Sequence, residues 1–213
     1  MSFDRDYDNT AELFGSSEDP LLRRFAAAID RQRPALDLGV GQGRNALFLA
    51  RAGMAVHGLD PSRVAVETVR DLALSENLPV TAYQTSFESF ECPAETYSAV
   101  LAFGLLPLLS WASIELLVDR VEAWTATGSL VLLTGFTTLD PRLEHVAAEG
   151  SRVGRNSFRL ADGQLRTYLE PGEARALFPA LSVVHHWEGL GPEHRHGSGP
   201  PERHGMFELV GRR

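Results

Sequence analysis

The chain alternates short apolar runs with segments in which apolar residues recur every three or four positions. The runs predict strands at 35–38, 55–59, 80–84, 97–103 and 129–136. The helical spacing predicts helices at about 45–51, 62–76 and 110–126, after a first helix that begins at Asp19-Pro20. Strands that alternate with helices indicate a single domain built on a parallel, doubly wound sheet.

The pattern changes after residue 136. Segments 156–160 and 164–169 flank the turn-forming Ala161-Asp162-Gly163 and predict a β-hairpin. A short helix follows over 171–178. Segments 182–190 and 206–213, joined by a loop rich in Gly, Pro and His, predict a second hairpin at the edge of the sheet.

The segment ALDLGVGQGRNALFLARAG carries the clearest functional pattern. Gly39, Gly41 and Gly43 follow the first strand, and the second strand ends on Asp60. Glycines let the backbone approach a ligand closely, and an acid at the tip of the next strand can accept hydrogen bonds from both ribose hydroxyls. The sequence therefore predicts a nucleoside-binding site.

Two cofactors fit the glycines differently. A dinucleotide frame, G-x-G-x-x-A, uses Gly41, Gly43 and Ala46 but places Asp37 inside the strand, where an unpaired carboxylate is costly to bury. A frame D-x-G-x-G-x-G places Asp37 at the strand tip, beside a cationic ligand group or an ordered water. S-adenosylmethionine (SAM) has an ammonium and a sulfonium and no phosphate, so Asp37 favours SAM. A nicotinamide-dependent oxidoreductase is the alternative.

LDLGVGQGRNALFLA followed by VHGLDPS resembles the first two motifs of the class I SAM-dependent methyltransferases. The GRNALFLA continuation and the C-terminal segment are most similar to the small methyltransferases that include the tellurite-resistance methyltransferase. The resemblance implies a Rossmann-like, mostly parallel seven-stranded sheet with an antiparallel C-terminal strand. It implies methyl transfer from SAM to a small-molecule acceptor, with S-adenosylhomocysteine as the product; chalcogen oxyanions are acceptors worth testing.

The same resemblance divides the chain into four parts. Residues 1–34 form an N-terminal helical cap, and residues 35–134 form the SAM-binding core. Residues 135–170 form an insertion on the acceptor side, and residues 171–213 supply a C-terminal helix and hairpin.

By resemblance, an acid after the third strand usually binds the adenine amino group, and Ser86 stands there. Ser98 replaces an acid that the family often has early in the fourth strand, which leaves a SAM-binding regulator without turnover as a further alternative. The residues expected to bind the cofactor are Asp37, Gly39, Gly41, Gly43, Asn45, Asp60, Pro61, Ser86, Phe87, Phe103 and Tyr7.

The sequence indicates the residues of the acceptor side less clearly than those of the cofactor site. Arg142, Arg155 and Arg166 belong to the segment that builds the acceptor pocket in similar enzymes, where guanidinium groups would meet an anionic acceptor. Candidates for a general base are the loop histidines His194, His196 and His204. Their loop lacks the support that metal ligands use, so no metal is expected.

The composition of the chain limits which partners and which chemistries are expected. The net charge is −8, so nucleic acid is not an expected partner. There is no lysine, which excludes Schiff-base chemistry, and the single Cys92 excludes an intrachain disulfide and suits a reducing cytoplasm. The apolar run 98–118 is interrupted by Gly104 and Pro107 and is expected to be a strand and a helix rather than a membrane span.

Overall fold

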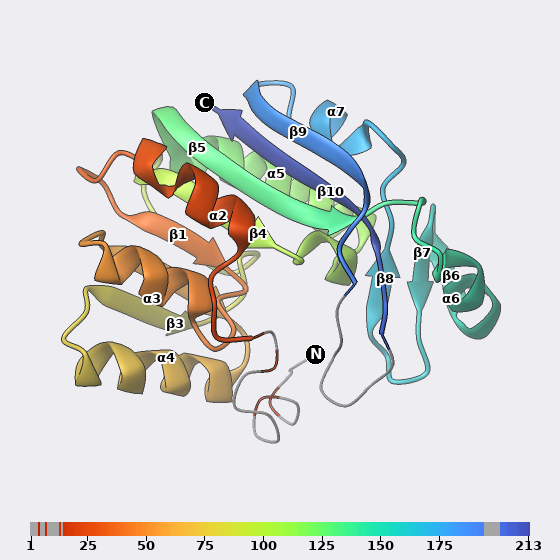
Figure 1. Cartoon of the computed structure of the whole chain (residues 1–213), viewed down its shortest axis with the longest axis horizontal. Coiled ribbons are helices and arrows are strands. Elements are labelled where there is room, and N and C mark those ends of the chain that lie inside the picture. The colour runs from red at the N-terminus through yellow and green to blue at the C-terminus, as the bar shows by residue number, and fades with distance from the viewer. Residues whose placement is uncertain (1–3, 5–6, 8–12, 14, 194–200) are drawn as a thin grey trace.

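The computed structural model describes residues 4, 7, 13, 15–193 and 201–213. Its centre is a seven-stranded sheet in the order β3-β2-β1-β4-β5-β10-β9 (Figure 1). The strands are β1 (Ala35–Leu38), β2 (Val56–Asp60), β3 (Val80–Gln84), β4 (Tyr97–Phe103), β5 (Thr125–Phe136), β9 (Ser182–Leu190) and β10 (Gly205–Arg212). β1 to β5 are parallel, and β10 is antiparallel to both of its neighbours, as predicted.

Helices cover both faces of this sheet. The helices are α2 (Pro20–Phe25), α3 (Arg44–Arg51), α4 (Arg63–Ser75), α5 (Trp111–Trp124), α6 (Leu143–Glu149) and α7 (Glu173–Leu177). In Figure 1, α2, α3 and α4 lie on one face, while α5 and α7 lie on the other. Because both faces are covered, every residue of β1 is buried, which explains why its apolar residues do not alternate with exposed polar ones.

The helices begin where the sequence predicts because capping side chains are present. Asp19, Ser62 and Ser110 accept hydrogen bonds from backbone N–H groups at the starts of α2, α4 and α5, respectively. Each cap satisfies a donor that has no partner within the helix.

The structure corrects one boundary. The helix expected over 110–126 ends at Trp124, and β5 begins at Thr125 rather than at residue 129. Thr125 pairs with Tyr97 across the sheet, and its Oγ1 donates to the carbonyl of Val121 at 2.6 Å. A β-branched residue with a sheet partner therefore overrides the helical spacing that continues to Ala126.

The predicted hairpin near residue 160 is present and is part of a larger unit. β7 (Ser157–Arg159) and β8 (Leu165–Thr167) pair antiparallel, and β6 (Ser151–Gly154) pairs with β7 as a third strand that the sequence did not predict. α6, which immediately precedes β6, was not predicted either. This three-stranded sheet and α6 lie beyond the carboxyl end of β5 (Figure 1).

The sheet order brings distant segments to one edge. The carboxyl ends of β1, β2, β4 and β5 share this edge because those strands are parallel and adjacent. The start of β10 reaches the same edge because β10 runs antiparallel to β5, with Met206 opposite Phe136. Ligands of open α/β sheets bind outside the carboxyl ends of the strands, so this edge is where a site is expected.

Candidate functional site

The turn after β1 is compact and fastens β1 to β2. The backbone N–H groups of Gly39 and Val40 both donate to the carbonyl of Leu59, at 2.8 and 2.9 Å. Gly43, which precedes α3, has a φ of +90°, and a Cβ at this position would lie 2.8 Å from Val69 Cγ2. The turn therefore requires glycine both for its left-handed backbone and for the closeness of α4.

Asp60 holds this turn from the tip of β2. Its Oδ2 accepts a hydrogen bond from the Gly41 N–H at 3.0 Å, and its Oδ1 accepts one from the Ser62 N–H at 2.8 Å. Burial raises the pKa of this carboxyl, the two N–H groups oppose the rise, and the charge of Asp4 adds to it. Each oxygen still has acceptor capacity, so both can receive a further donor.

Asp37 lies inside β1, one residue before its end and opposite Gly58 and Leu101 of the neighbouring strands, rather than at the strand tip that the sequence predicts. It is the least satisfied polar group at this edge. The residue is 2% exposed, and its Oδ2 accepts no hydrogen bond from any residue that the structure describes. Burial raises the pKa of Asp37 to about 8; Arg44 lowers it, Asp60 raises it, and a hydrogen bond from the Ala46 N–H lowers it. A buried oxygen without a partner costs roughly 1–3 kcal/mol, which marks a place where a donor or cation would be favourable.

Three described positions of the N-terminal segment contact this region. Tyr7 is buried, and its Oη lies 3.1 Å from where a Cβ on Gly41 would be. The Leu13 N–H donates to Gln42 Oε1 at 2.9 Å. Asp4 accepts hydrogen bonds from the Ser62 hydroxyl and from a backbone N–H at the start of α4. These three residues therefore lie against the glycine turn and the start of α4.

The structure places the other expected cofactor residues in different surroundings. Asn45 accepts a hydrogen bond from the Asp19 N–H at 2.9 Å and so fastens α3 to the cap of α2. Pro61 is exposed and Ser86 is half-buried. Phe87 is buried in the core on the α5 face, whereas Phe103 packs against the core on the α2–α4 face.

His204 forms a close pair with Asp140, a residue that the sequence analysis did not single out. His204 Nδ1 lies 2.8 Å from Asp140 Oδ2, and the ring stacks on Phe136 at 4.6 Å between centroids. The two residues are 64 positions apart in the chain. An acid shortly after the carboxyl end of β5 is the only sequence signal for Asp140. His194 and His196 lie outside the described residues.

Two of the three candidate arginines lie near each other, and the third does not join them. Arg142, at the start of α6, and Arg166, on β8, both influence the pKa of Tyr168. Burial lowers the pKa of the Arg166 guanidinium, and the charge of Arg142 lowers it further. Arg155 instead stacks over the Trp111 ring, 4.3 Å from its centroid, and forms an ion pair with Glu173.

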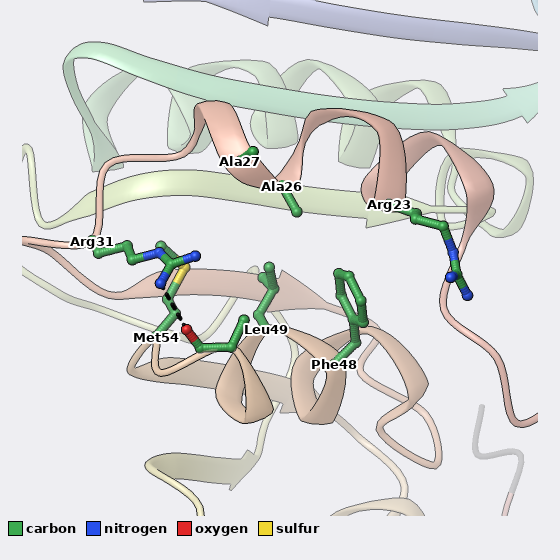
Figure 2. Close-up of a pocket in the computed structure, with 8 residues that line it drawn as sticks. Arg23, Ala26, Ala27, Arg31, Phe48, Leu49 and Met54 are labelled. Carbon is green, nitrogen blue, oxygen red and sulfur yellow. Dashed lines mark hydrogen bonds between the residues drawn. The ribbon is translucent and has the colours of Figure 1, made fainter.

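A hollow of about 230 Å³ lies between α2 and α3. Figure 2 shows its mostly apolar lining, with Arg23 and Arg31 at its ends. Arg31 donates to the carbonyl of Ala52 at 2.9 Å, at the end of α3 remote from the glycine turn. The hollow is therefore separate from the carboxyl edge of the sheet.

Neither a cluster of metal-ligating residues nor a membrane-spanning helix occurs in the part of the chain that the structure describes. Within those residues, no group of three or more His, Cys, Asp or Glu is arranged to hold a metal ion. No helix among them is long and apolar enough to cross a membrane.

Comparison with known sequences identifies similar proteins. Residues 35–128 match the methyltransferase domain family. Hemagglutinin 1 of Eikenella corrodens is 28% identical over 158 residues, which are 73% of this chain and 49% of that protein. The uncharacterised methyltransferase YodH of Bacillus subtilis is 30% identical over 80 residues, which are 38% of this chain and 34% of that protein. The chain thus matches about half or less of each curated relative.

Solved structures share the fold over almost the whole chain. A SAM-dependent methyltransferase of Methanosarcina mazei has a TM-score of 0.73 at 15% identity and covers 92% of this chain and 98% of its own. TehB of Haemophilus influenzae has a TM-score of 0.70 at 16% identity and covers 99% of this chain and 65% of its own. Residues 35–128 therefore match the methyltransferase domain family, and the chain has the fold of the class I SAM-dependent methyltransferases.

Proposed function

We propose that this protein transfers the methyl group of SAM to a small-molecule acceptor. It is an enzyme of the methyltransferase family, and its cofactor is SAM. The observation that carries the assignment of the site is the buried Oδ2 of Asp37, which has no hydrogen-bond partner among the described residues and lies beside a glycine turn that Asp60 stabilises. A cationic amino-acid group and a ribose are the two ligand chemistries that such a pair of acids suits.

Different residues of the chain would bind different parts of the cofactor. Asp60 would accept hydrogen bonds from the ribose hydroxyls with its remaining lone pairs. Asp37 would face the ammonium group, and Ser86 would accept from the adenine amino group. Tyr7 would cover the glycine turn on the side of Gly41. Asn45, Pro61, Phe87 and Phe103 keep only supporting roles in this proposal, because their side chains serve the fold or lie outside the turn.

SAM supplies a methyl group that is already activated by the sulfonium. The protein must therefore orient an acceptor toward that methyl group, exclude water and remove a proton where the acceptor carries one. Tyr7, Leu13 and the three-stranded sheet flank the carboxyl edge, which suits the exclusion of water. The negative net charge supports a small acceptor rather than a nucleic acid.

The same observation weighs against a dinucleotide. A pyrophosphate bound at the glycine turn would place negative charge beside the buried Asp37 carboxyl and oppose its ionisation, whereas a cationic ligand group would favour it. A dinucleotide loop offers backbone N–H groups and gains nothing from a buried acid at this point.

Transfer of labelled methyl groups tests the proposal. The protein is incubated with methyl-labelled SAM and a panel of small phenols, N-heterocycles, thiols and tellurite. We expect the wild-type protein and Asp71→Ala, which removes an exposed carboxylate of α4, to label at least one acceptor. Asp60→Ala should label none, since it removes the proposed ribose acceptor and the anchor of Gly41. Equal labelling by Asp60→Ala would contradict the assignment.

A further inference from the structure

The pairing of His204 with Asp140 fixes which ring nitrogen is basic. The Asp140 side chain is fully buried, and its Oδ1 accepts a hydrogen bond from the Arg142 N–H at 2.8 Å, which orients the carboxylate. Its Oδ2 lies 2.8 Å from His204 Nδ1. A carboxylate at Nδ1 holds the proton of the neutral imidazole on that nitrogen, which leaves Nε2 as the basic one.

His204 also lies at the edge of the sheet that holds the glycine turn. It directly precedes β10, and the next residue, Gly205, accepts a hydrogen bond at its carbonyl from the Thr137 N–H, just beyond β5. Strands are about 4.8 Å apart, so β10 lies about 10 Å from β4 along the sheet. This is within the reach of a small molecule bound outside the ends of β4 and β5.

The acids at the glycine turn decide which side of the edge an acceptor would use. Asp60 is on β2 and Asp37 is on β1, so the ribose and the amino-acid group would occupy that side. The ends of β4, β5 and β10 remain for the acceptor. His204 stands on this remaining side.

We propose that His204, oriented by Asp140, is the general base that deprotonates a hydroxyl or N–H acceptor in this enzyme. The inference rests on the proposed methyl transfer and names the class of acceptor. The acceptor oxygen or nitrogen forms a bond to the methyl carbon, the carbon–sulfur bond breaks with its electron pair moving to sulfur, and the acceptor proton moves to His204 Nε2. The imidazolium then returns its proton to water.

The charged groups around the ring suit a base that becomes a cation. Asp140 contacts Nδ1, and Glu202 Oε2 lies 4.0 Å from Nε2, so both carboxylates favour the imidazolium. Arg142 forms an ion pair with Glu202 and moderates that attraction. Tyr168 lies behind Phe136, with ring centroids 5.9 Å apart, and burial raises its pKa to about 12, which keeps it neutral.

Kinetics of His204→Gln test the proposal, with His145→Gln, which changes an exposed histidine of α6, as the matched control. For phenolic and N-heterocyclic acceptors, we expect kcat to fall about 100-fold or more with KM and S-adenosylhomocysteine affinity within twofold of wild type. Asp140→Asn should lower kcat, and His145→Gln should match wild type.

An NMR measurement that needs no acceptor accompanies the kinetics. In protein with ¹⁵N-labelled histidine, the neutral form of His204 should have its proton on Nδ1, and Asp140→Asn should shift the proton toward Nε2. A neutral His204 with its proton on Nε2 overturns the proposal. Full activity of His204→Gln also overturns it. If the protein binds S-adenosylhomocysteine but methylates only thiols or tellurite, or no acceptor in the panel, the proposal is likewise overturned. Failure of the wild type to bind that compound would instead refute the proposed function.

Discussion

Asp37 and Asp60 are both carboxylates buried near the carboxyl ends of neighbouring strands, and their surroundings differ. Asp60 accepts a backbone N–H at each oxygen, so it stabilises the turn before any ligand arrives. Asp37 leaves its Oδ2 without a partner among the described residues, so burial without compensation dominates. Asp37, whose carboxyl is less completely hydrogen-bonded than that of Asp60, is therefore the better candidate for direct contact with a cation.

Asp37→Asn should stabilise the protein at pH 8 while weakening S-adenosylhomocysteine binding. A carboxyl with a folded pKa of about 8 keeps a proton that the unfolded chain loses near pH 4. Folding stability therefore falls as pH rises between these values, by up to about 1.4 kcal/mol per pH unit. Asn has no such titration, so the Tm advantage of the variant should grow from pH 5 to pH 8. A Tm difference that is the same at both values would contradict the burial of this charge.

The glycine turn and α3 form the element on which the site depends. Gly43 and Gly53 lie at opposite ends of α3, and both have positive φ. A Cβ at Gly53 would meet no atom within 4 Å, whereas one at Gly43 would meet Val69, which is fully buried on α4. Substitutions at the two glycines therefore distinguish the cost of backbone strain, which both positions share, from the cost of crowding, which only Gly43 has.

Gly43→Ala should cost more stability than Gly53→Ala. The second change adds only the strain of a left-handed alanine, about 1–2 kcal/mol. The first adds crowding against a side chain that cannot move away, about 1–3 kcal/mol more. Urea denaturation of both variants measures the difference. If the free energies of unfolding fell by equal amounts, α4 would not pack against the turn as described.

The strands and helices of the sheet could be predicted because their patterns are local. β1 and β4 are buried on both faces and are apolar apart from Asp37 and Ser98, and Asp19 and Ser62 mark helix starts. β6 could not be predicted in this way, because its residues are largely exposed and it exists through pairing with β7.

The candidate site likewise has one part that local sequence patterns predict and one part that they do not. Asp37, Asp60 and the glycines stand in one continuous motif, so sequence reasoning finds them. The pair of Asp140 and His204 joins segments 64 residues apart, and only the insertion of β10 beside β5 brings them together. Sequence spacing carries no signal for such a contact.

Across the chain, two cores on opposite faces of the sheet hold the carboxyl edge in place. Phe207 of β10 is fully buried in the core on the α5 face, and its ring packs over Gly135 of β5. This contact fixes β10 beside β5 and therefore the position of His204. Stability and the acceptor side of the site are thus linked through one strand.

Phe207→Ala should lower the free energy of unfolding by about 3–5 kcal/mol, because it leaves a cavity in a packed core. Leu74→Ala, which changes a leucine that is 82% exposed on α4, should change it by less than about 0.5 kcal/mol. Denaturant titration followed by circular dichroism measures both. Similar small effects for the two variants would contradict the placement of β10 between β5 and β9.

Calorimetric titration with S-adenosylhomocysteine, with NADH as the control ligand, tests the central claim most directly. The protein is first unfolded and refolded to remove any copurified cofactor. We expect S-adenosylhomocysteine to bind with micromolar affinity or better, about −8 kcal/mol, and NADH not to bind. Absence of S-adenosylhomocysteine binding, or binding of NADH in its place, would contradict the assignment of the glycine turn, Asp37 and Asp60 to SAM.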